Sequence, residues 1–329
     1  MIDTIYLETA VRDHPRTRQL LERFPRAMVV PIERYGAVFN RRNQSFRLQK
    51  SKPALILAEK HDGHVLPTPA TYGIGAQANY YFSHMLNCLY DCRYCFLQGM
   101  YRSAHYVLFV NFEQFYDAID ARLAEHPDEP VHFFSGYDCD SLALENLTGF
   151  ATSALPFFAA RPRALLELRT KSIQTRPLRD ATPIPNCVVA YSLMPQPLAD
   201  RLDHRAPSVA RRLDAMAALA EQGWPIGLRF DPLIAHPEFE SLYGALFEQI
   251  FARLRADQIH SVSYGPMRFP KGMYRDIVRL YPEEPVFAGP LERRGKVVAY
   301  DASAESEMQA FCRTALTRHV PERVFYCAP

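Results

Sequence analysis

Hydrophobic residues along this chain form two alternating patterns: short continuous runs, and longer stretches in which apolar residues recur every three or four positions. The first pattern is typical of buried strands and the second of helices with one buried face. The strand-like runs are residues 81–86, 131–135, 165–169, 188–193, 226–233 and 259–264, and the helix-like stretches are 112–125, 145–160, 208–222 and 238–256. Strand and helix repeated in this order predict a parallel sheet joined by right-handed crossovers.

About six such units predict an α/β fold with an open, partial (β/α)6 barrel over residues 71–270, rather than a closed eight-fold barrel. Residues 1–70 are irregular and interrupted by prolines, with a connector at 68–73, and we expect them to pack on the barrel as an N-terminal basic extension. Residues 271–329 are expected to add a C-terminal hairpin and helix on the substrate side, with the apolar end of the chain packed back onto the barrel.

The composition is that of an ordinary globular protein, with 48% hydrophobic and 22% charged residues among 329. No apolar run approaches the roughly 20 residues that cross a bilayer. The N-terminus lacks the basic and apolar segments of a secretory signal. We therefore expect a cytoplasmic protein with no membrane contact, and we expect a monomer.

Positive charge is concentrated at the start of the chain. The net charge is +2, yet residues 1–52 hold eleven Lys and Arg against five Asp and Glu. A basic segment beside a neutral body fits contact with a polyanion such as nucleic acid. An Arg-rich surface that meets only solvent explains the charge at least as well, and both interpretations stay open.

The seven cysteines, an odd number at uneven spacing, favour reduced thiols over a disulfide framework. Cys88, Cys92 and Cys95 follow the first predicted strand with C-x3-C-x2-C spacing. Loops at the carboxyl ends of strands line the site of an α/β barrel. Three thiolates on one such loop can hold three irons of a [4Fe–4S] cluster and leave the fourth open for the amino and carboxylate groups of S-adenosylmethionine (SAM).

The cysteine triplet therefore predicts a radical SAM enzyme. In such enzymes one electron from the cluster releases a 5′-deoxyadenosyl radical from SAM, and the radical takes hydrogen from a substrate. A structural zinc site with His84 as its fourth ligand is an alternative. His84 lies within a predicted strand, however, and structural zinc sites usually pair two cysteine doublets. Three cysteines buried only for packing are a further alternative, which this spacing disfavours.

Positions beyond the cysteines carry a wider resemblance. They are Cys88–Gln98, Val110-Asn111, Leu147-Thr148, Thr170-Lys171, Ser192, Ser208–Leu213, Gly223–Gly227 and Asp231-Pro232. With them the chain resembles the spore photoproduct lyase family of radical SAM enzymes, which reverse a thymine–thymine photolesion in DNA. The resemblance runs from residue 51 to beyond Arg268, without a gap over residues 137–231. It implies an iron–sulfur cluster and SAM as cofactors, and a reductant such as flavodoxin or ferredoxin.

The resemblance also implies roles for particular residues. Tyr94, between the last two cysteines, is expected near the adenine of SAM, and the other SAM-contacting positions fall on Cys139, Lys171, Ser192 and Asp231. A lysine can pair with the SAM carboxylate, and a serine hydroxyl with its ribose or amino group. The structural alternatives are a surface lysine for Lys171, a helix cap or turn for Ser192, and a buried core thiol for Cys139.

The chain departs from the family where the product radical regains a hydrogen atom. The family's donor is a cysteine after the second strand; that position is Tyr137, and Cys139 lies two places later. The family tyrosine that follows the last cluster cysteine is Phe96, which cannot donate. Donation by Cys139, donation by the Tyr137 phenol, and a reaction without returned hydrogen are three open alternatives.

Three acids, Asp138, Asp140 and Glu145, surround the same loop. They can bind the SAM amino group or a cationic substrate, or cap the helix that follows. Acids are favoured at helix N-termini, so we expect capping for at least one of them.

Arg and aromatic side chains are the candidates for DNA contact, because a lesion must leave the base stack to reach a buried radical. The basic segment offers Arg41, Arg42, Arg47 and Lys50, and the C-terminal region offers Arg268, Lys271, Arg293, Arg294 and Lys296 around a hairpin tip predicted at 292–297. Tyr101, Arg102 and Tyr106 form a possible stacking edge. An ordinary solvated turn and plain packing residues are the alternatives.

Three functions follow. The leading hypothesis is a carbon–carbon lyase that repairs a pyrimidine photolesion or a related lesion in DNA. The second is a radical SAM enzyme that acts on a small molecule or peptide, which the Tyr137 and Phe96 departures favour. The third is a non-catalytic nucleic-acid-binding protein with a structural cluster or zinc.

Overall fold

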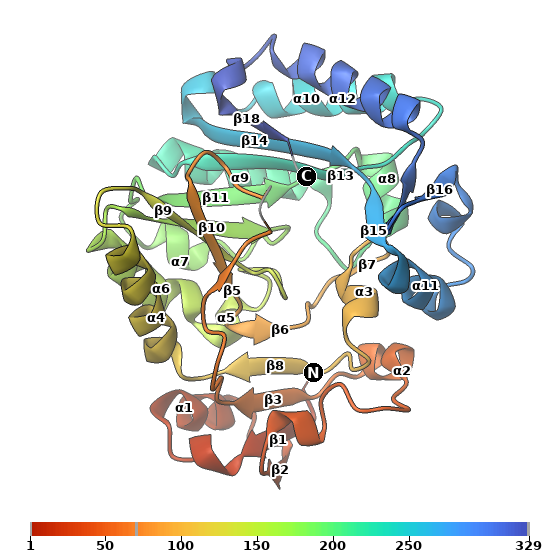
Figure 1. Ribbon diagram of the computed structural model, residues 1–329. Helices are drawn as coiled ribbons and strands as arrows, with labels where there is room; N and C mark the ends of the chain where they lie inside the picture. The colour runs from red at the N-terminus through yellow and green to blue at the C-terminus, as the bar shows by residue number, and fades with distance from the viewer. Residues whose placement is uncertain (1, 70–71, 328–329) are drawn as a thin grey trace.

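The computed structural model describes residues 2–69 and 72–327, and its main element is a curved eight-stranded sheet (Figure 1). The sheet order is β18-β14-β13-β11-β10-β9-β5-β4. The strands are β4 (Leu66–Pro67), β5 (Ala78–Phe82), β9 (Val131–Ser135), β10 (Ala164–Thr170), β11 (Cys187–Ser192), β13 (Ile226–Leu233), β14 (Ile259–Pro266) and β18 (Phe325–Cys327). The six from β5 to β14 pair in parallel with their neighbours, so the predicted partial (β/α)6 barrel is confirmed. Residues 70 and 71 of the predicted connector lie outside the described residues.

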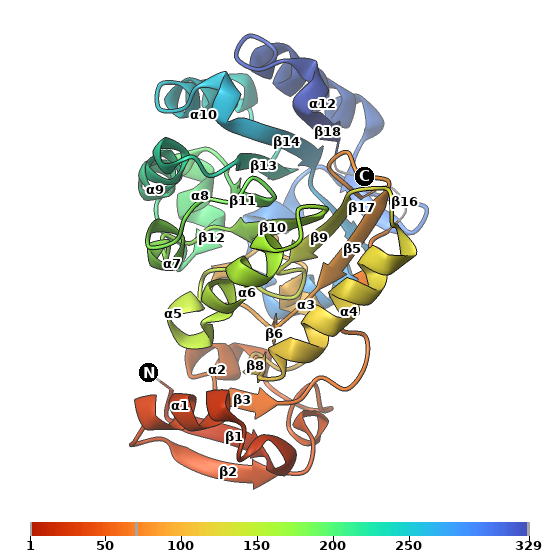
Figure 2. The same ribbon diagram turned by 90° about the vertical axis from the view of Figure 1, so that its left-hand side faces the viewer.

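Helices cover the outer face of this sheet, as the crossover pattern predicts (Figure 2). They are α4 (Phe112–Glu125), α5 (Glu145–Thr148), α6 (Phe150–Ala159), α7 (Arg176–Arg179), α8 (Gln196–Leu202), α9 (Val209–Gln222) and α10 (Phe239–Phe251). Helix α9 shows how the sequence sets these elements. The Ser208 hydroxyl accepts a hydrogen bond from the backbone N–H of Arg211, and Gly223 ends the helix with a φ of 101°. Leu213 and Met216, three positions apart, are fully buried on its inner face.

The N-terminal region is a second sheet at the bottom of Figure 1, so the prediction of an irregular extension is wrong. Its order is β2-β1-β3-β8-β6. The strands are β1 (Thr4–Glu8), β2 (Met28–Ile32), β3 (Leu55–Ala58), β8 (Tyr106–Phe109) and β6 (Met85–Leu86), and the helices of this region are α1 (Pro15–Arg23) and α2 (Phe46–Ser51). The prolines fit this fold, because Pro15 is the first residue of α1 and Pro31 lies on the edge strand β2. Since β6 and β8 come from within residues 71–270, the sheet joins both regions of the chain.

The first predicted barrel strand, residues 81–86, is divided between the two sheets. Its beginning belongs to β5 and its end to β6, with Ser83 and His84 between them. The residues at both ends of this run are apolar, so hydrophobicity alone did not reveal the break.

The C-terminal region adds a three-stranded antiparallel sheet and a long helix. The elements are β15 (Arg268–Pro270), α11 (Lys271–Leu280), β16 (Leu291–Arg294), β17 (Val297–Tyr300) and α12 (Ala302–Leu316). Strands β16 and β17 form the predicted hairpin, and β18 pairs with β14, so the chain end packs onto the barrel as expected. The remaining elements are β7 (Asp91–Cys92), α3 (Leu97–Met100), β12 (Asp203–His204) and 3-10 turns at Thr9–Val11, Tyr35–Ala37, Ala256–Gln258, Pro285–Ala288 and Glu322–Val324. Within the described residues, no helix combines the length and apolar character of a bilayer span.

Candidate active site

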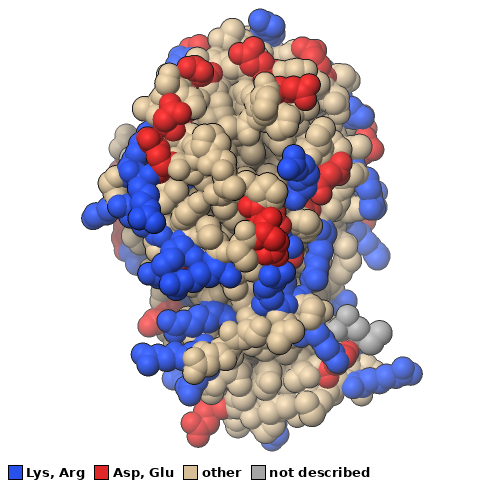
Figure 3. Space-filling view, turned by 90° about the vertical axis from the view of Figure 1, so that its right-hand side faces the viewer, with Lys and Arg blue, Asp and Glu red and all other residues tan. Residues whose placement is uncertain are grey.

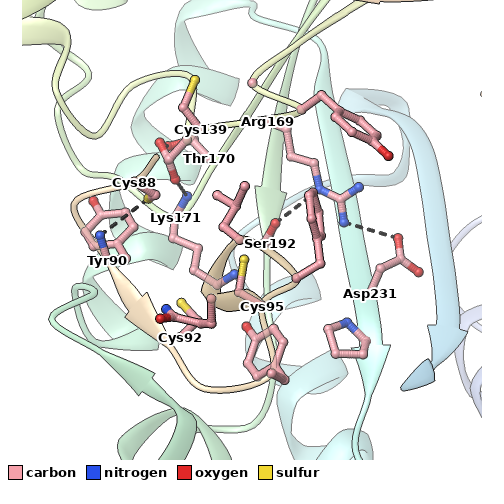
Figure 4. A pocket seen from close by; sticks show the side chains of 18 of the residues that line it. Cys88, Tyr90, Cys92, Cys95, Cys139, Arg169, Thr170, Lys171, Ser192 and Asp231 are labelled. Atoms are coloured by element: carbon pink, nitrogen blue, oxygen red, sulfur yellow. Dashed lines mark hydrogen bonds and ion pairs between the residues drawn. The ribbon is translucent and has the colours of Figure 1, made fainter. Parts of the chain in front are cut away.

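A cavity of about 360 Å³ opens at the carboxyl ends of the barrel strands (Figure 4). Its wall comes from the loop between β6 and α3, the ends of β9, β10, β11 and β13, and the segment that joins β14 to β15. Ligand sites of parallel α/β folds lie at this end of the strands. The cavity is therefore the candidate active site.

Cys88, Cys92 and Cys95 all line this cavity. Asn87 turns the chain into their loop with a φ of 68°. Its side-chain amide donates hydrogen bonds of 2.7 Å to the backbone carbonyls of Ser103 and His105. Strand β7, which contains Cys92, pairs with β12. The cysteine loop is thus held by its own backbone before any metal binds.

Lys50 anchors the same loop from α2. The residue is only 5% exposed, and its Nζ donates hydrogen bonds to the backbone carbonyls of Cys88 at 2.7 Å and Tyr90 at 2.8 Å. A buried ammonium group with these two acceptors is not available to nucleic acid. The prediction that Lys50 contacts DNA is therefore wrong, and sequence reasoning missed its role as a loop anchor.

The described side chains do not complete a zinc site around the three cysteines. All six cysteines whose side chains are described are free thiols. In the described part of the chain, no three His, Cys, Asp or Glu side chains converge to hold one metal ion. A [4Fe–4S] cluster takes each thiolate on a different iron, so its ligands need not converge on one point. His84, the fourth zinc ligand of the alternative, is buried and stacks on Phe150 at a centroid distance of 4.0 Å; burial lowers its pKa to about 3.

Burial keeps these thiols neutral in the metal-free protein. It raises the pKa of Cys88 to about 12, and it raises the pKa values of Cys92 and Cys95 above their ordinary range. Only the thiolate is a metal ligand, so cluster assembly must displace these protons.

Lys171 belongs to a buried charge cluster beside the cysteines. Its Nζ lies 4.0 Å from an Asp203 carboxylate oxygen and 5.3 Å from the centre of the Tyr94 ring. Asp203 also accepts hydrogen bonds from the Tyr94 hydroxyl at 2.5 Å and from Arg212 at 2.8 Å. Burial alone lowers the pKa of Lys171, but the Asp203 carboxylate reverses this effect and holds it above its usual value. The surface-lysine alternative is therefore wrong, and sequence reasoning missed Asp203 and Arg212.

Arg169 is the central cation on the opposite wall of the cavity (Figure 4). Its guanidinium donates to the Ser192 hydroxyl at 3.4 Å, to the Asp231 carboxylate at 3.4 Å and to the Tyr72 hydroxyl at 3.1 Å. Ser263 donates to the same Asp231 oxygen at 2.5 Å, while the other oxygen, Oδ1, is buried without a partner. Ser192 ends β11 and caps no helix, so the helix-cap alternative is wrong. Sequence reasoning also missed Arg169.

The acids of the loop after β9 are structural. Asp140 accepts hydrogen bonds from the Thr170 hydroxyl at 2.6 Å and the Lys171 backbone N–H at 2.7 Å, which fixes the end of β10. Glu145 accepts hydrogen bonds from the backbone N–H groups of Ala151 at 3.0 Å and Thr152 at 3.2 Å, at the start of α6. The prediction that at least one acid caps a helix is confirmed by Glu145.

Tyr137 stands at the rim of the cavity and is 38% exposed. Its ring contacts those of Tyr81 and Phe96, at centroid distances of 4.3 and 5.4 Å. Cys139 also lines the cavity but is 6% exposed. In Figure 4 its sulfur points away from Lys171 and Ser192.

Most of the basic candidates for DNA contact are exposed. Figure 3 shows a band of Lys and Arg across one face of the molecule, the right-hand side of Figure 1, toward which β13 and β14 run. The exposed candidates are Arg41, Arg42, Arg47, Arg102, Arg268, Lys271, Arg293 and Lys296. Arg268 also forms part of the cavity wall. Arg294 is half-buried and forms an ion pair with Glu305. Tyr101 is half-buried and donates to Asp138, and Tyr106 is buried in β8, so a stacking role for Tyr106 is wrong.

Comparison with known sequences points to one family. A family profile described as "Spore photoproduct lyase" matches residues 1–323. The chain is 26% identical over 222 residues to the "Spore photoproduct lyase" of Bacillus subtilis (strain 168), which spans 67% of this chain and 65% of the relative. It is 23% identical over 255 residues to a protein of the same description from Geobacillus sp. (strain Y412MC61), with 74% of each chain covered. The alignment therefore reaches just under two thirds of the B. subtilis protein.

Solved structures agree on the fold. A cysteine-to-serine mutant described as spore photoproduct lyase superposes with a TM-score of 0.84 at 20% identity. A double mutant of the same description, "with bound AdoMet and dinucleoside spore photoproduct", superposes with a TM-score of 0.85 at 19% identity. Both comparisons cover 99% of this chain and 98% of the other chain.

Proposed function

The chain belongs to the spore photoproduct lyase family, and we propose that it is a radical SAM enzyme that repairs a pyrimidine photolesion or a related lesion in DNA. One observation carries the proposal. The cavity places three free thiols opposite a polar wall that has a cation and an unpaired carboxylate oxygen. When bound there, a [4Fe–4S] cluster supplies one electron to the sulfonium of SAM and so generates a 5′-deoxyadenosyl radical.

We assign cluster binding to Cys88, Cys92 and Cys95. Lys50 fixes the carbonyls at the start of their loop, so the thiols are positioned before the metal arrives. Near them the wall includes apolar and aromatic side chains, among them Tyr94, Phe96 and Leu97. Such a wall keeps water away from a reactive radical.

We assign SAM binding to Lys171, Ser192 and Asp231, with Tyr94 beside the adenine. The Lys171 ammonium suits the SAM carboxylate, because Asp203 keeps it charged in a buried setting. The free Oδ1 of Asp231 and the Ser192 hydroxyl suit the ribose hydroxyls and the amino group. Arg169 bonds both of these side chains and so holds their orientation.

We assign DNA binding to the exposed cations around the cavity mouth. Arg268 is both exposed and part of the cavity wall, which suits contact with a lesion turned out of the base stack. Arg41, Arg42, Lys271 and Arg293 are exposed and suit the phosphates. Arg294 pairs with Glu305, so we assign it to the shape of the hairpin. The similar structure described with AdoMet and a dinucleoside photoproduct supports testing this pair of ligands.

We further propose a flavodoxin or ferredoxin as the electron donor and a monomeric enzyme. The cluster needs a one-electron carrier, and proteins of these two classes are such carriers.

The test is an anaerobic reconstitution with iron and sulfide, followed by dithionite, SAM and either irradiated or intact DNA. We expect 5′-deoxyadenosine to form with irradiated DNA and to stay at background with intact DNA, and Cys92→Ala to abolish it. Equal 5′-deoxyadenosine with both DNAs would contradict the DNA substrate. None at all, from a protein that holds its full complement of iron, would contradict the radical reaction.

A further inference from the structure

A lyase leaves its substrate at its original oxidation level, so a hydrogen atom removed early in the reaction has to be replaced on the product radical. Besides the cluster cysteines, five side chains in the described part of the cavity wall carry a weak and transferable hydrogen: the Cys139 thiol and the phenols of Tyr72, Tyr90, Tyr94 and Tyr137. The Tyr94 hydroxyl is committed to Asp203 and the Tyr72 hydroxyl is bonded by Arg169. We compare the two that lie on the loop after β9, Cys139 and Tyr137. Their positions in the wall separate the two.

The backbone of Tyr137 is fixed on both sides. Gly136 precedes it with a φ of 81°, and a Cβ there would lie 2.6 Å from the Ser141 hydroxyl, so only glycine fits this turn. On the other side, the Asp138 backbone N–H donates to the Ser83 hydroxyl at 3.2 Å. The Asp138 carboxylate accepts a hydrogen bond from the Tyr101 hydroxyl at 3.1 Å. These contacts present the Tyr137 ring to the cavity beside Phe96, the residue that follows the last cluster cysteine.

The Tyr137 ring also contacts Tyr81. Tyr81 comes from β5, and the two rings lie 4.3 Å apart, centre to centre, with 31° between their planes. Tyr81 is half-buried and Tyr137 is 38% exposed, so the pair connects the cavity with the outside of the protein. Tyrosine is oxidised to a stable phenoxyl radical, and two phenols in contact can exchange a hydrogen atom.

Cys139 is placed differently. It is buried, and its sulfur points away from Lys171 and Ser192 of the SAM-binding wall (Figure 4). Of the two side chains, Tyr137 is the more accessible from the cavity mouth, at 38% exposure against 6% for Cys139.

We infer that Tyr137 returns the hydrogen atom to the product radical and that Tyr81 restores Tyr137, an inference that rests on the proposed function. The O–H bond of Tyr137 breaks, a C–H bond forms on the product, and a phenoxyl radical remains on Tyr137. Tyr81 passes its phenolic hydrogen atom to Tyr137. The Tyr81 phenoxyl then takes one electron from a carrier of the class that reduces the cluster, and one proton from water.

This route has a stoichiometric consequence. Because the phenoxyl radical is quenched by an external electron and a proton, 5′-deoxyadenosine keeps the hydrogen that it took from the substrate, and SAM is not regenerated. One SAM is consumed for each lesion repaired.

The experiment compares Tyr137→Phe and Tyr81→Phe with Tyr116→Phe in D2O, with irradiated DNA. Phenylalanine preserves the stacked rings and removes only the hydroxyl. Tyr116 is the matched control, because it lies on α4, stacks on Phe157 at 4.4 Å and is remote from the cavity wall. Repaired thymine, its deuterium content and 5′-deoxyadenosine are measured by mass spectrometry, and phenoxyl radicals by electron paramagnetic resonance.

We expect wild type and Tyr116→Phe to give one 5′-deoxyadenosine per repaired lesion, with one deuterium in the product. Tyr137→Phe should keep lesion-dependent 5′-deoxyadenosine and lose repaired product. Tyr81→Phe should complete a first turnover and then accumulate a phenoxyl signal. Full repair by Tyr137→Phe, or many repairs per SAM, would overturn the inference. A wild-type enzyme that forms no 5′-deoxyadenosine would instead overturn the proposed function.

Discussion

Replacing Lys50 with Met removes the ammonium group that ties the cysteine loop to α2. Its Nζ makes hydrogen bonds of 2.7 and 2.8 Å to the carbonyls of Cys88 and Tyr90 inside the protein. A hydrogen bond to a charged group contributes about 1.5–3 kcal/mol, and a buried carbonyl left without a donor adds a penalty. Because both bonds share one donor they do not simply add, so we expect the free energy of unfolding to fall by about 3 kcal/mol.

Lys52→Met is the matched control, two residues away on the same segment. The Lys52 side chain is 72% exposed and pairs with Asp3 on the surface, where ion pairs contribute little. Urea unfolding of the metal-free proteins measures stability, and iron per chain after anaerobic reconstitution measures cluster binding. We expect Lys50→Met to lower both and Lys52→Met to change neither. Unchanged stability and iron content in Lys50→Met, combined with weaker DNA binding, would refute the anchoring role and restore the surface role predicted from sequence.

Three further predictions concern buried charge, a helix cap and the DNA surface. Arg229→Met leaves the Glu167 carboxylate, otherwise paired at 2.7 Å, buried and alone, and should lower stability at pH 7 by about 3–5 kcal/mol in urea unfolding. In wild type, burial opposes ionisation but the Arg229 guanidinium still holds the pKa of Glu167 below its usual value. In wild type, the stabilisation from the ionised Glu167 is therefore complete above its pKa in the unfolded chain and is lost as the pH falls through its pKa in the folded protein. In the variant, protonation relieves the unpaired carboxylate, so the free energy of unfolding should rise between pH 7 and 5. Glu145→Ala removes the cap of α6 and should cost about 1 kcal/mol in thermal unfolding; an unchanged melting temperature would contradict the cap. Arg268→Ala should weaken binding to irradiated DNA and lower the slope of log affinity against log salt concentration by about 1, both measured by fluorescence anisotropy. An equal loss from Arg294→Ala would contradict the assignment of Arg268 to DNA and of Arg294 to the hairpin.

The barrel and the cysteine loop were predictable because both are local in the sequence. Buried parallel strands are continuous apolar runs, and the strand predicted at 131–135 has the bounds of β9. The spacing of Cys88, Cys92 and Cys95 likewise lies within one loop. The fold class therefore followed from periodicity and the cluster prediction from spacing.

The second sheet was not predictable, because its strands are short and their partners are distant. Strand β3 pairs with β8, and roughly fifty residues that include the cysteine loop separate them in the chain. The loop between β5 and β6 likewise interrupts one apolar run that passes from one sheet to the other. A pattern read along the chain carries no signal for such pairings.

The polar residues that complete the cavity were missed for a related reason. Lys50 and Asp203 act on the cysteine loop from remote segments, and each looks like an ordinary surface residue in the sequence. Arg169 lies in an apolar strand, where its charge is compatible with burial only because Asp231 and Tyr72 are brought to it by other elements. Partners of this kind are properties of the folded chain.

The origin of the hydrogen atom in 5′-deoxyadenosine tests the central claim most directly. DNA made with thymidine that is deuterated throughout its base is irradiated and given to the reconstituted, reduced enzyme with SAM. The account predicts that 5′-deoxyadenosine gains one deuterium from this DNA and that no product forms in the Cys92→Ala variant. Unlabelled 5′-deoxyadenosine, formed at the same rate with or without the DNA, would contradict it.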